Sequence, residues 1–507
     1  MHNAIILTDY TDSVFLTRPL GPYKIAHELR KLNVDTTVIN HIHMWNQDEL
    51  HEFINSLINS KTLFVGVNNM YYKNADDVDF YAPEHITLKP AYKGQVLPQG
   101  KEASDRFVKF VKSKELPLIL GGPTAIDQQH NAVFDYLLQG FADTSIEGFV
   151  NHLKSGTKIP NSYRSVFGPV VVQDTNEIAG WDFANSTMHW QDKDVILPNE
   201  TMSIEIARGC IFKCAFCYYP LIGKKKFDYI RQFDIIKQEM IDNWKRFGVT
   251  RYYFSDETFN DSIFKLEQME KLASELPFKL EYFAYLRLDL IIKHPETIGM
   301  LFRSGLRATH FGIETFHPTA GKAIGKKFKP DQVIQVLKQL KEISNGEINL
   351  HGSFIVGLPG ESKEHILKIY NMLKTKELPL DSFVYFPLCI GHTSYFSKNY
   401  ESYGYHKMTG DAADQYVQKY AELIPWKSDV MTCLEAVDFA KELDQGGFAF
   451  KQIGGLASFE IAGLGFDQDF YLNKKYNEID WSAIVLRKID RFNEYKSKLK
   501  SFAITNH

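Results

Sequence analysis

The sequence predicts an α/β protein. An N-terminal Rossmann-like doubly wound parallel sheet is followed by a partial (β/α)6 barrel and a mainly helical C-terminal region. Two observations predict this order. Short apolar runs alternate with helical patterns over residues 1–150 and again over residues 201–395, which is typical of parallel βαβ units. Residues 396–507 instead contain mostly helical patterns, and residues 151–200 are predicted to be a connector.

Length and composition favour a multidomain enzyme. A chain of 507 residues is long for one domain, and 44% hydrophobic residues can fill more than one core. The net charge of −4 gives no general attraction to nucleic acid or to anionic membranes. No apolar run reaches the length of about 18 residues that a membrane span needs. Three of the five cysteines are clustered, which favours a reducing compartment and predicts a cytoplasmic protein.

The N-terminal part is predicted to bind a ligand at one edge of its sheet. Its predicted strands are residues 4–7, 36–39, 63–67, 118–120 and 136–138. In an open doubly wound sheet, ligands bind outside the carboxyl ends of the strands. Gly121 and Gly122 directly follow one of these strands, and glycine lets a ligand approach the backbone closely.

A cysteine-rich stretch opens the second α/β part. Residues 206–220 read I-A-R-G-C-I-F-K-C-A-F-C-Y-Y-P and contain Cys210, Cys214 and Cys217. Thiolates at such short spacings are typical ligands of iron–sulfur clusters. Three cysteines on a [4Fe-4S] cluster leave one iron open for chemistry. A structural zinc site with a fourth ligand elsewhere remains an alternative.

Six strand–helix repeats follow from this stretch. The predicted strands are residues 203–207, 251–254, 280–286, 308–312, 348–357 and 383–387. In α/β barrels the reactive site lies at the carboxyl ends of the strands. The candidate site residues Asp256, Glu257, Arg287, Glu314 and Gly357 all lie at or just after such ends.

The spacing C-x3-C-x-aromatic-C, with Phe216 as the aromatic residue, resembles the motif of the radical S-adenosylmethionine (SAM) enzymes. The resemblance implies that Cys210, Cys214 and Cys217 hold a [4Fe-4S] cluster. In this family the open iron binds the amino and carboxylate groups of SAM, and the reduced cluster cleaves a carbon–sulfur bond to give a 5′-deoxyadenosyl radical. The resemblance also implies a small-molecule or peptide substrate and an electron donor such as flavodoxin or ferredoxin.

The same resemblance implies roles for the residues at the strand ends. D-E-T-F stands where the family has a motif that holds the SAM amino group, so either Asp256 or Glu257 could do so. Arg287 could pair with the SAM carboxylate. Glu314 in G-I-E matches the acceptor of the ribose hydroxyls, and Gly357 belongs to a stretch that flanks the adenine. Taken singly, these residues could instead be a helix cap, a surface ion pair and a turn.

The N-terminal part is similar to the cobalamin-binding domain that precedes many radical SAM cores. The similar pieces are R-P-L-G-P-Y, L-I-L-G-G-P-T-A and D-Y-L-L-Q-G-F. This similarity implies cobalamin at Gly121 and Gly122. The motif D-x-H-x-x-G, which supplies a histidine ligand to cobalt, does not occur in the sequence. We therefore expect no protein ligand on the lower face, and His41 and His43, which we expect to be solvated, are the first residues to test. A domain kept as a scaffold is the alternative.

The function that the resemblance implies is that of a radical SAM enzyme, namely a cobalamin-dependent methyltransferase or rearrangement enzyme acting at an unactivated carbon. A cobalamin-independent enzyme with a vestigial domain and a non-catalytic protein stabilised by iron–sulfur or zinc remain alternatives. The methylthiotransferase relatives carry a second cysteine triad in their N-terminal domain, whereas this chain has no cysteine before Cys210. Cys389 and Cys433 are isolated and are predicted to be unreactive. The basic stretch 487–500 is interpreted as a solvated helix face rather than a nucleic-acid site.

Overall fold

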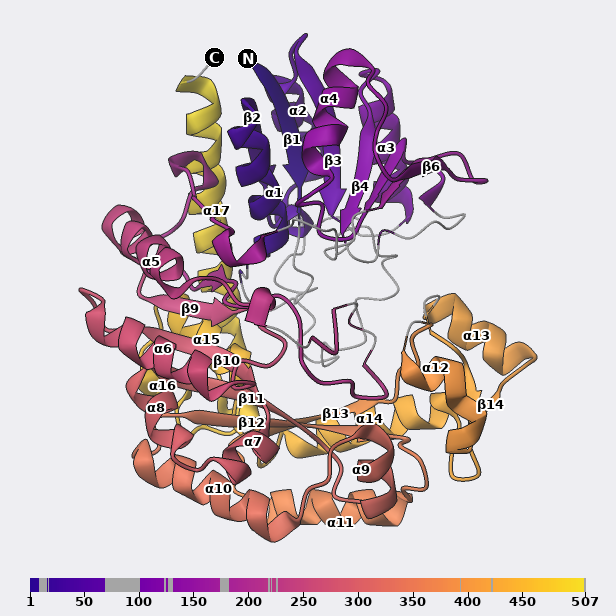
Figure 1. Cartoon of the computed structure of the whole chain (residues 1–507), viewed down its shortest axis with the longest axis vertical. Helices are drawn as coiled ribbons and strands as arrows, with labels where there is room; N and C mark the ends of the chain where they lie inside the picture. The colour runs from indigo at the N-terminus through magenta and orange to yellow at the C-terminus, as the bar shows by residue number, and fades with distance from the viewer. Residues whose placement is uncertain are drawn as a thin grey trace. The chain divides into compact units, whose positions relative to one another are not determined.

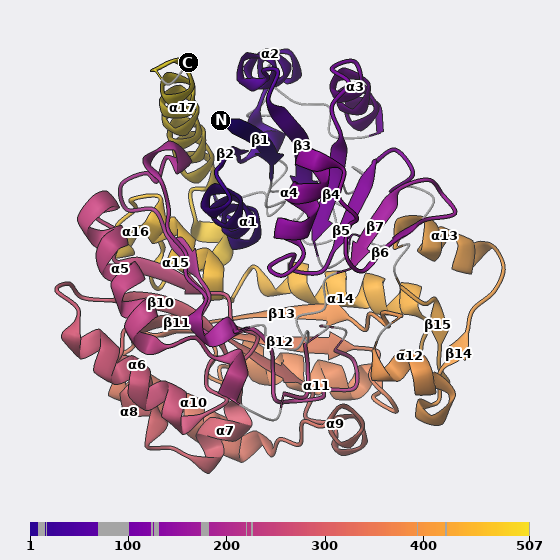
Figure 2. The same ribbon diagram turned by 45° about the horizontal axis from the view of Figure 1, so that its top comes forward.

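The computed structural model of the chain divides into two compact units (Figures 1 and 2). The first, here the N-terminal unit, comprises Met1–Asp182, Ser186–Glu200 and Trp481–His507. The second, here the barrel unit, comprises Phe183–Asn185 and Thr201–Asp480. The structure describes residues 1–8, 16, 18–68, 101–122, 125, 131–173, 182–217, 219, 221–224, 227–392, 394–420 and 423–505.

The N-terminal unit contains a seven-stranded sheet in the order β2-β1-β3-β4-β5-β7-β6. Its strands are β1 (His2–Leu7), β2 (Val34–Ile39), β3 (Thr62–Asn68), β4 (Leu118–Gly122), β5 (Tyr136–Gln139), β6 (Ser162–Arg164) and β7 (Val170–Gln173). All neighbouring strands pair in parallel except β6, which is antiparallel to β7. The strand order reverses between β1 and β3, which is where ligands bind in such sheets. The predicted doubly wound sheet is confirmed.

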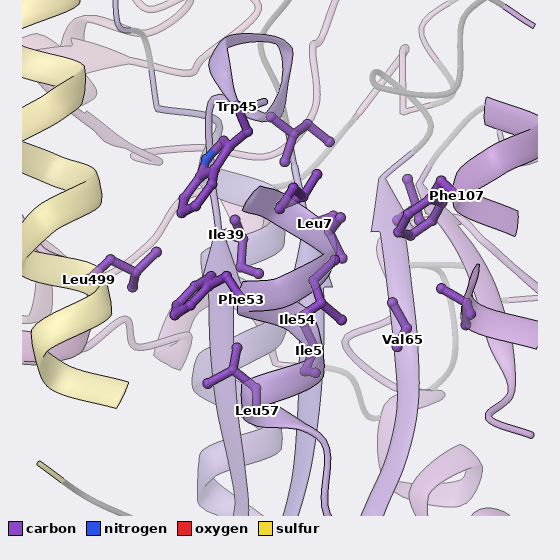
Figure 3. Packing of buried hydrophobic residues seen from close by; sticks show 14 of the residues in the cluster. Ile5, Leu7, Ile39, Trp45, Phe53, Ile54, Leu57, Val65, Phe107 and Leu499 are labelled. Carbon is purple, nitrogen blue, oxygen red and sulfur yellow. The ribbon is translucent and has the colours of Figure 1, made fainter. Parts of the chain in front are cut away.

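The helices of this unit bury apolar faces against the sheet, and one of them comes from the far end of the sequence. They are α1 (Leu20–Lys31), α2 (Gln47–Leu57), α3 (Lys101–Lys112), α4 (Ile146–Ser155) and α17 (Trp481–Thr505). Trp45 stacks on Phe53 at 5.4 Å between ring centroids, and Phe492 of α17 meets Trp45 edge-on at 6.0 Å. Figure 3 shows Leu499 of α17 facing the same cluster.

Two boundaries predicted from the sequence differ from the structure. The predicted connector 151–200 contains β6 and β7, and β7 pairs with β5 through Tyr136 and Val170. This strand is only four residues long, so its apolar run gave too weak a signal. The predicted C-terminal region 396–507 is also not one body, because α17 contributes to the core of the N-terminal unit.

The barrel unit contains six parallel strands in sequential order, which confirms the predicted partial (β/α)6 architecture. The strands are β8 (Met202–Ile204), β9 (Arg251–Phe254), β10 (Glu281–Leu286), β11 (Leu306–Glu314), β12 (Asn349–Val356) and β13 (Ser382–Pro387). The helices between them are α5 (Phe233–Phe247), α6 (Ile263–Glu275), α7 (Leu288–Lys293), α8 (Thr297–Arg303), α9 (Pro318–Ile324), α10 (Pro330–Ile343) and α11 (Lys363–Lys374).

The rest of the barrel unit contains α12 (Tyr395–Asn399), β14 (His406–Lys407), α13 (Asp411–Lys419), β15 (Trp426–Lys427), α14 (Cys433–Gly447), α15 (Gly455–Gly463) and α16 (Gln468–Tyr471). Of these elements, α14 and α15 pack onto the six-stranded sheet. Phe459 of α15 is buried against Phe283 of β10 and Ala308 of β11. Gly447 of α14 lies against Phe383 of β13 so closely that a Cβ atom there would approach the ring to 2.7 Å. No helix in the described ranges is long and apolar enough to cross a membrane.

Candidate functional site

The loop after β8 holds the three clustered cysteines. The backbone N–H of Cys210 donates to the carbonyl of Leu221 (2.9 Å), and the N–H of Lys224 donates to the carbonyl of Cys210 (3.0 Å). A tight turn closes the other end, where the N–H of Cys217 donates to the carbonyl of Cys214 (3.0 Å). These backbone hydrogen bonds hold the loop in its conformation without using the cysteine side chains, which leaves the thiols available as ligands.

The three thiols are free and lie close enough to influence one another. Burial raises the pKa of Cys210, and burial raises the pKa of Cys217 to about 11, with the charge of Cys214 contributing to both shifts. The triad suits an iron–sulfur cluster, whose binding would remove the thiol protons. Among the residues that the structure describes, no three His, Cys, Asp or Glu side chains surround a point that would hold a single metal ion.

Asp256 connects the end of β9 to the start of this loop. Its Oδ1 accepts from the backbone N–H groups of Ile206 (3.1 Å) and Ala207 (3.0 Å). Its Oδ2 lies 3.1 Å from Nζ of Lys265, whose side chain is fully buried and also contacts Asp261 at 2.8 Å. Both carboxylate oxygens of Asp256 are therefore engaged by the protein, and Asp256 is a positioning residue.

Glu257 differs sharply from its neighbour. Its side chain reaches solvent, and within the described part of the chain no group donates a hydrogen bond to its carboxylate. Desolvation by the surrounding protein is the larger cause, and the negative charge of Asp256 the smaller one, that raises the pKa of Glu257 to about 7. Its charge in turn raises the pKa of Cys217, so it lies near the cysteine loop. Of the two predicted acidic candidates, Glu257 is the one that remains open to a ligand.

Arg287 lies directly beside the cysteines. Its Nη1 donates to Sγ of Cys214 (3.2 Å), and its guanidinium lies 3.8 Å from the ring centroid of Phe212. Nε and Nη2 donate to the two carboxylate oxygens of Asp289 at 2.9 and 2.7 Å. Asp289 thus fixes the plane of the guanidinium while Nη1 faces the sulfur. The structure brings Arg287 to the predicted cluster, although its pairing with the SAM carboxylate stays a prediction.

Glu314 and Phe216 are brought together by a lysine that the sequence analysis missed. Glu314 ends β11 with φ of 68°, and its Oε1 accepts from Nζ of Lys326 (2.8 Å). The same ammonium donates to the carbonyl of Gly312 (2.9 Å) and lies 5.8 Å from the ring centroid of Phe216. Nothing in the local sequence around Lys326 marks it, because the contact depends on how the loop after β11 returns to the strand.

Gly357 is enclosed by the C-terminal part of the barrel unit. Its φ is 98°, and a Cβ atom would approach the Trp426 ring to 2.5 Å. Its carbonyl accepts from the hydroxyl of the buried Tyr405 (2.8 Å). The glycine is therefore required by backbone conformation and by close packing. Its proposed contact with adenine stays a prediction.

A buried acidic group follows Gly357 in the chain and was not predicted. Glu361 is 1% exposed, and its Oε1 accepts from the hydroxyl of Thr315 (2.6 Å). In the described part of the chain, neither its Oε2 nor the hydroxyl of Tyr385 has a hydrogen-bonding partner. Burial raises the pKa of Glu361 to about 7.

In the N-terminal unit, the predicted cobalamin residues lie at the carboxyl end of β4. A Cβ atom at Gly121 would meet no atom of the described residues within 4 Å, so these residues leave room for a ligand at this strand end. Gly122 has φ of 134°, and its carbonyl accepts from the N–H of Gly140 at the end of β5 (3.2 Å). The position fits the close approach of a flat ligand to the backbone.

His41 is not the solvated residue that the sequence analysis expected. It is 3% exposed, and its ring lies 5.5 Å from that of Tyr495 of α17. Its backbone N–H donates to the side-chain oxygen of Asn40 (2.8 Å). The reason is that α17 covers the end of β2, which local sequence does not show. The side chain of His43 lies outside the described residues.

The two remaining cysteines, Cys389 and Cys433, have sulfur contacts that do not involve the three clustered cysteines. Sγ of Cys389 lies 3.5 Å from the carbonyl of Pro387, and Sγ of Cys433 lies 3.6 Å from Sδ of Met408. Burial raises the pKa of Cys433, and it raises that of Cys389 to about 12. Both thiols are thus protonated at neutral pH and poorly nucleophilic.

The cysteine loop and the parallel barrel together define a class of protein. Residues 204–373 match the model of the Radical SAM superfamily, so the chain carries a radical SAM domain. The match begins at the last residue of β8 and ends in α11, and it contains the cysteine triad, Arg287 and Glu314.

Solved structures extend the likeness of fold to the whole chain. The radical SAM methyltransferase TsrM of Kitasatospora setae, with cobalamin and a [4Fe-4S] cluster bound, matches over 100% of both chains with a TM-score of 0.64 and 15% identity. The cobalamin-dependent radical SAM enzyme OxsB, with aqua-cobalamin bound, matches 79% of this chain and 56% of its own with a TM-score of 0.53 and 14% identity. The chain therefore has the fold of cobalamin-dependent radical SAM enzymes.

Curated relatives match a smaller part. An uncharacterized methyltransferase of Pyrococcus horikoshii is 25% identical over 160 residues, or 32% of this chain and 34% of that protein. The ribosomal protein uS12 methylthiotransferase RimO of Carboxydothermus hydrogenoformans is 29% identical over 180 residues, or 34% of this chain and 40% of that protein. The chain thus spans less than half of the length of these relatives.

Proposed function

We propose that the protein is a radical SAM enzyme that reductively cleaves SAM at a [4Fe-4S] cluster held by Cys210, Cys214 and Cys217. The observation that carries the proposal is the set of three free thiols on a backbone-fixed loop, beside an open carboxylate and a guanidinium. The bound cluster would supply the electron that breaks the carbon–sulfur bond of SAM. The protein's own residues bind and orient that substrate.

Each polar residue at the strand ends has a distinct role in this proposal. Glu257 accepts a hydrogen bond from the SAM amino group, because Asp256 is already engaged by the backbone and by Lys265. Arg287 attracts the SAM carboxylate through Nη1, with its orientation fixed by Asp289. Glu314 accepts from the ribose hydroxyls with its second carboxylate oxygen, while Lys326 holds the first.

We further propose that the N-terminal unit binds cobalamin at Gly121 and Gly122 and that the reaction methylates an unactivated carbon of a small molecule or peptide. Cobalamin would supply a methyl carrier. The open space at Gly121 and the fold shared with TsrM and OxsB support this. The burial of His41 against Tyr495 supports a lower face without a ligand from that residue. A cobalamin-independent reaction is the second candidate.

A reduced cluster requires an electron donor, and we propose a flavodoxin or ferredoxin in the cytoplasm. Cluster assembly on free thiols needs the reducing conditions of that compartment. We propose no nucleic-acid partner and no membrane partner.

The test is anaerobic reconstitution with iron and sulfide, followed by dithionite and SAM. Release of 5′-deoxyadenosine is the expected result. Cys214→Ala should lose the cluster absorbance and this release together, whereas the matched control Cys389→Ala should keep both. A Cys214→Ala protein with full cluster absorbance and normal release would refute the assignment.

Cobalamin is tested separately by incubation with hydroxocobalamin and removal of the excess. We expect stoichiometric retention and a Co(II) resonance spectrum without nitrogen splitting. If micromolar protein retains no cobalamin, the cobalamin-independent candidate replaces the first.

A further inference from the structure

Two histidines and a tyrosine lie side by side on one face of the barrel sheet. Tyr285 of β10 is in register with His310 of β11, and His310 is in register with His351 of β12. The ring centroids of Tyr285 and His310 are 5.0 Å apart, and those of His310 and His351 are 4.7 Å apart and nearly perpendicular. The three rings therefore form one continuous row across three strands.

This row lies on the same face as the predicted cluster. Side chains two residues apart on a strand share a face, and Arg287 follows Tyr285 by two residues in extended backbone. Nη1 of Arg287 contacts Sγ of Cys214. The row of three rings therefore lies one layer of side chains below Arg287, and the two layers are about 7 Å apart along the strand. In β11 the residue above His310 on this face is Gly312, and the ion pair of Glu314 and Lys326 occupies the space beside it, since a Cβ atom there would lie 2.4 Å from Oε1 of Glu314 and 2.6 Å from Nζ of Lys326.

The burial pattern shows that the described residues do not cover this row completely. Tyr285, His310 and His351 are each partly exposed, whereas Leu286, Phe311 and Leu350 on the opposite face are fully buried. Below the row the start of α15 closes the face, since a Cβ atom at Gly455 would lie 3.1 Å from Cβ of His351. The row is thus a partly accessible layer of the sheet's inner face, between the start of α15 and the ion pair of Glu314 and Lys326.

Both imidazoles are neutral and have unused hydrogen-bonding capacity. Burial lowers the pKa of His310 to about 3, with a further contribution from Lys326, and it also lowers that of His351. Nδ1 of His351 is buried beside Gly454, where a Cβ atom would lie 2.6 Å from it, so Nε2 is the nitrogen of this ring that a ligand can reach. The described residues offer no hydrogen bond to this Nε2 or to the ring of His310. A neutral imidazole has one N–H donor and one acceptor nitrogen, so this pair can accept a hydrogen bond from a bound group.

We propose that His310 and His351 bind the substrate of the radical SAM reaction, and that the bound portion is a neutral aromatic or heteroaromatic ring with one N–H or O–H donor. This inference rests on the proposed function. The rings of Tyr285 and the partly exposed Tyr253, 6.3 Å apart, supply aromatic surface for such a ring. A cationic group is disfavoured because Lys326 lies close to His310.

The experiment uses ring probes that differ only in the donor. Equilibrium dialysis of the reconstituted full-length protein with SAM compares indole with 1-methylindole and phenol with anisole. We expect indole, phenol or both to bind at least about fivefold more tightly than the partner that lacks the donor, as for one hydrogen bond. His310→Phe and His351→Phe should bring that ratio close to one. His294→Phe, at a part-exposed histidine after α7, is the matched control and should leave it unchanged.

Two outcomes overturn the proposal. One is a ratio near one for both probe pairs in the wild-type protein, a measurement that needs no variant to fold. The other is an unchanged ratio in His310→Phe and His351→Phe proteins that retain cluster absorbance. Failure of the proposed function is recognised separately, because it would appear as absent 5′-deoxyadenosine release whatever the probes do.

Discussion

The buried ion cluster under the cysteine loop gives the sharpest test of how the site is held. Lys265 contributes the one ammonium that contacts both Asp256 (3.1 Å) and Asp261 (2.8 Å), and none of the three side chains is more than 1% exposed. Lys265→Met keeps most of the side-chain volume and leaves two carboxylates buried without their cation. Breaking a buried ion pair in this way costs about 3–5 kcal/mol.

The assay is differential scanning calorimetry of the cluster-free protein. At roughly 2–4 °C per kcal/mol for a unit of this size, Lys265→Met should lower the Tm of the barrel unit by about 6–20 °C. Lys237→Met is the matched control, because Lys237 also pairs with a carboxylate, Glu275, but at the surface, where solvent screens the pair and its loss should leave the Tm almost unchanged. Iron incorporation should fall as well, since Asp256 positions the backbone of Ile206 and Ala207.

The pH dependence of the stability loss in Lys265→Met distinguishes the effect of the missing charge from the effect of altered packing. Burial raises the pKa of Asp256, and removing Lys265 removes the cation that opposes this shift, so lowering the pH from 8 to 6 favours protonation of Asp256 and should shrink the loss of stability. A loss below about 1 kcal/mol, or one equally large at both pH values, would refute the reasoning from buried charge.

Three further predictions concern single residues. SAM affinity should rise about tenfold from pH 6 to pH 8, because Glu257, whose pKa is about 7, ionises over this range. In parallel calorimetric titrations the Glu257→Gln protein should not show this rise in affinity with pH. Identical pH profiles of the two proteins would exclude a contact between Glu257 and SAM. Burial raises the pKa of Glu361 from 4.5 to about 7, so the folded protein loses stability as the pH rises through this interval. The Glu361→Gln protein should therefore be about 3 kcal/mol more stable than the wild type at pH 8 but little different at pH 4.5. Equal unfolding curves of the two proteins at both pH values would contradict this. Gly121→Ala should keep the wild-type Tm, because its methyl group would contact none of the described residues, yet it should retain at least tenfold less hydroxocobalamin than the control Gly21→Ala in α1, which is equally uncrowded. Equal retention by the two variants would remove Gly121 from the cobalamin site.

The parts of the fold that local sequence specifies were predicted well. The apolar run at 251–254 coincides with β9, and the Cys210, Cys214 and Cys217 spacing marks its loop because all three ligands lie within eight residues. Such features depend on neighbours in sequence, and a pattern is therefore sufficient to find them.

The features that were missed depend on contacts between distant residues. Gly357 was interpreted from its motif alone, but Trp426 and Tyr405 enclose it from a later part of the chain. Lys265 and Lys326 look like surface lysines on helical or loop segments until the fold buries them against Asp256 and Glu314. Sequence patterns report which residues can form a strand or helix, whereas these roles are set by what packs on top.

The return of α17 to the N-terminal unit has a consequence for synthesis on the ribosome. The core around Trp45 and Phe53 lacks Phe492, Tyr495 and Leu499 until α17 has been translated. Between Glu200 and Trp481 about 280 residues must be translated, which takes roughly 15–60 s at about 5–20 residues per second. During that interval the nascent N-terminal sheet exposes an apolar flank, so chaperone demand should be high, and supplying residues 481–507 as a separate peptide should rescue a chain that stops at residue 480.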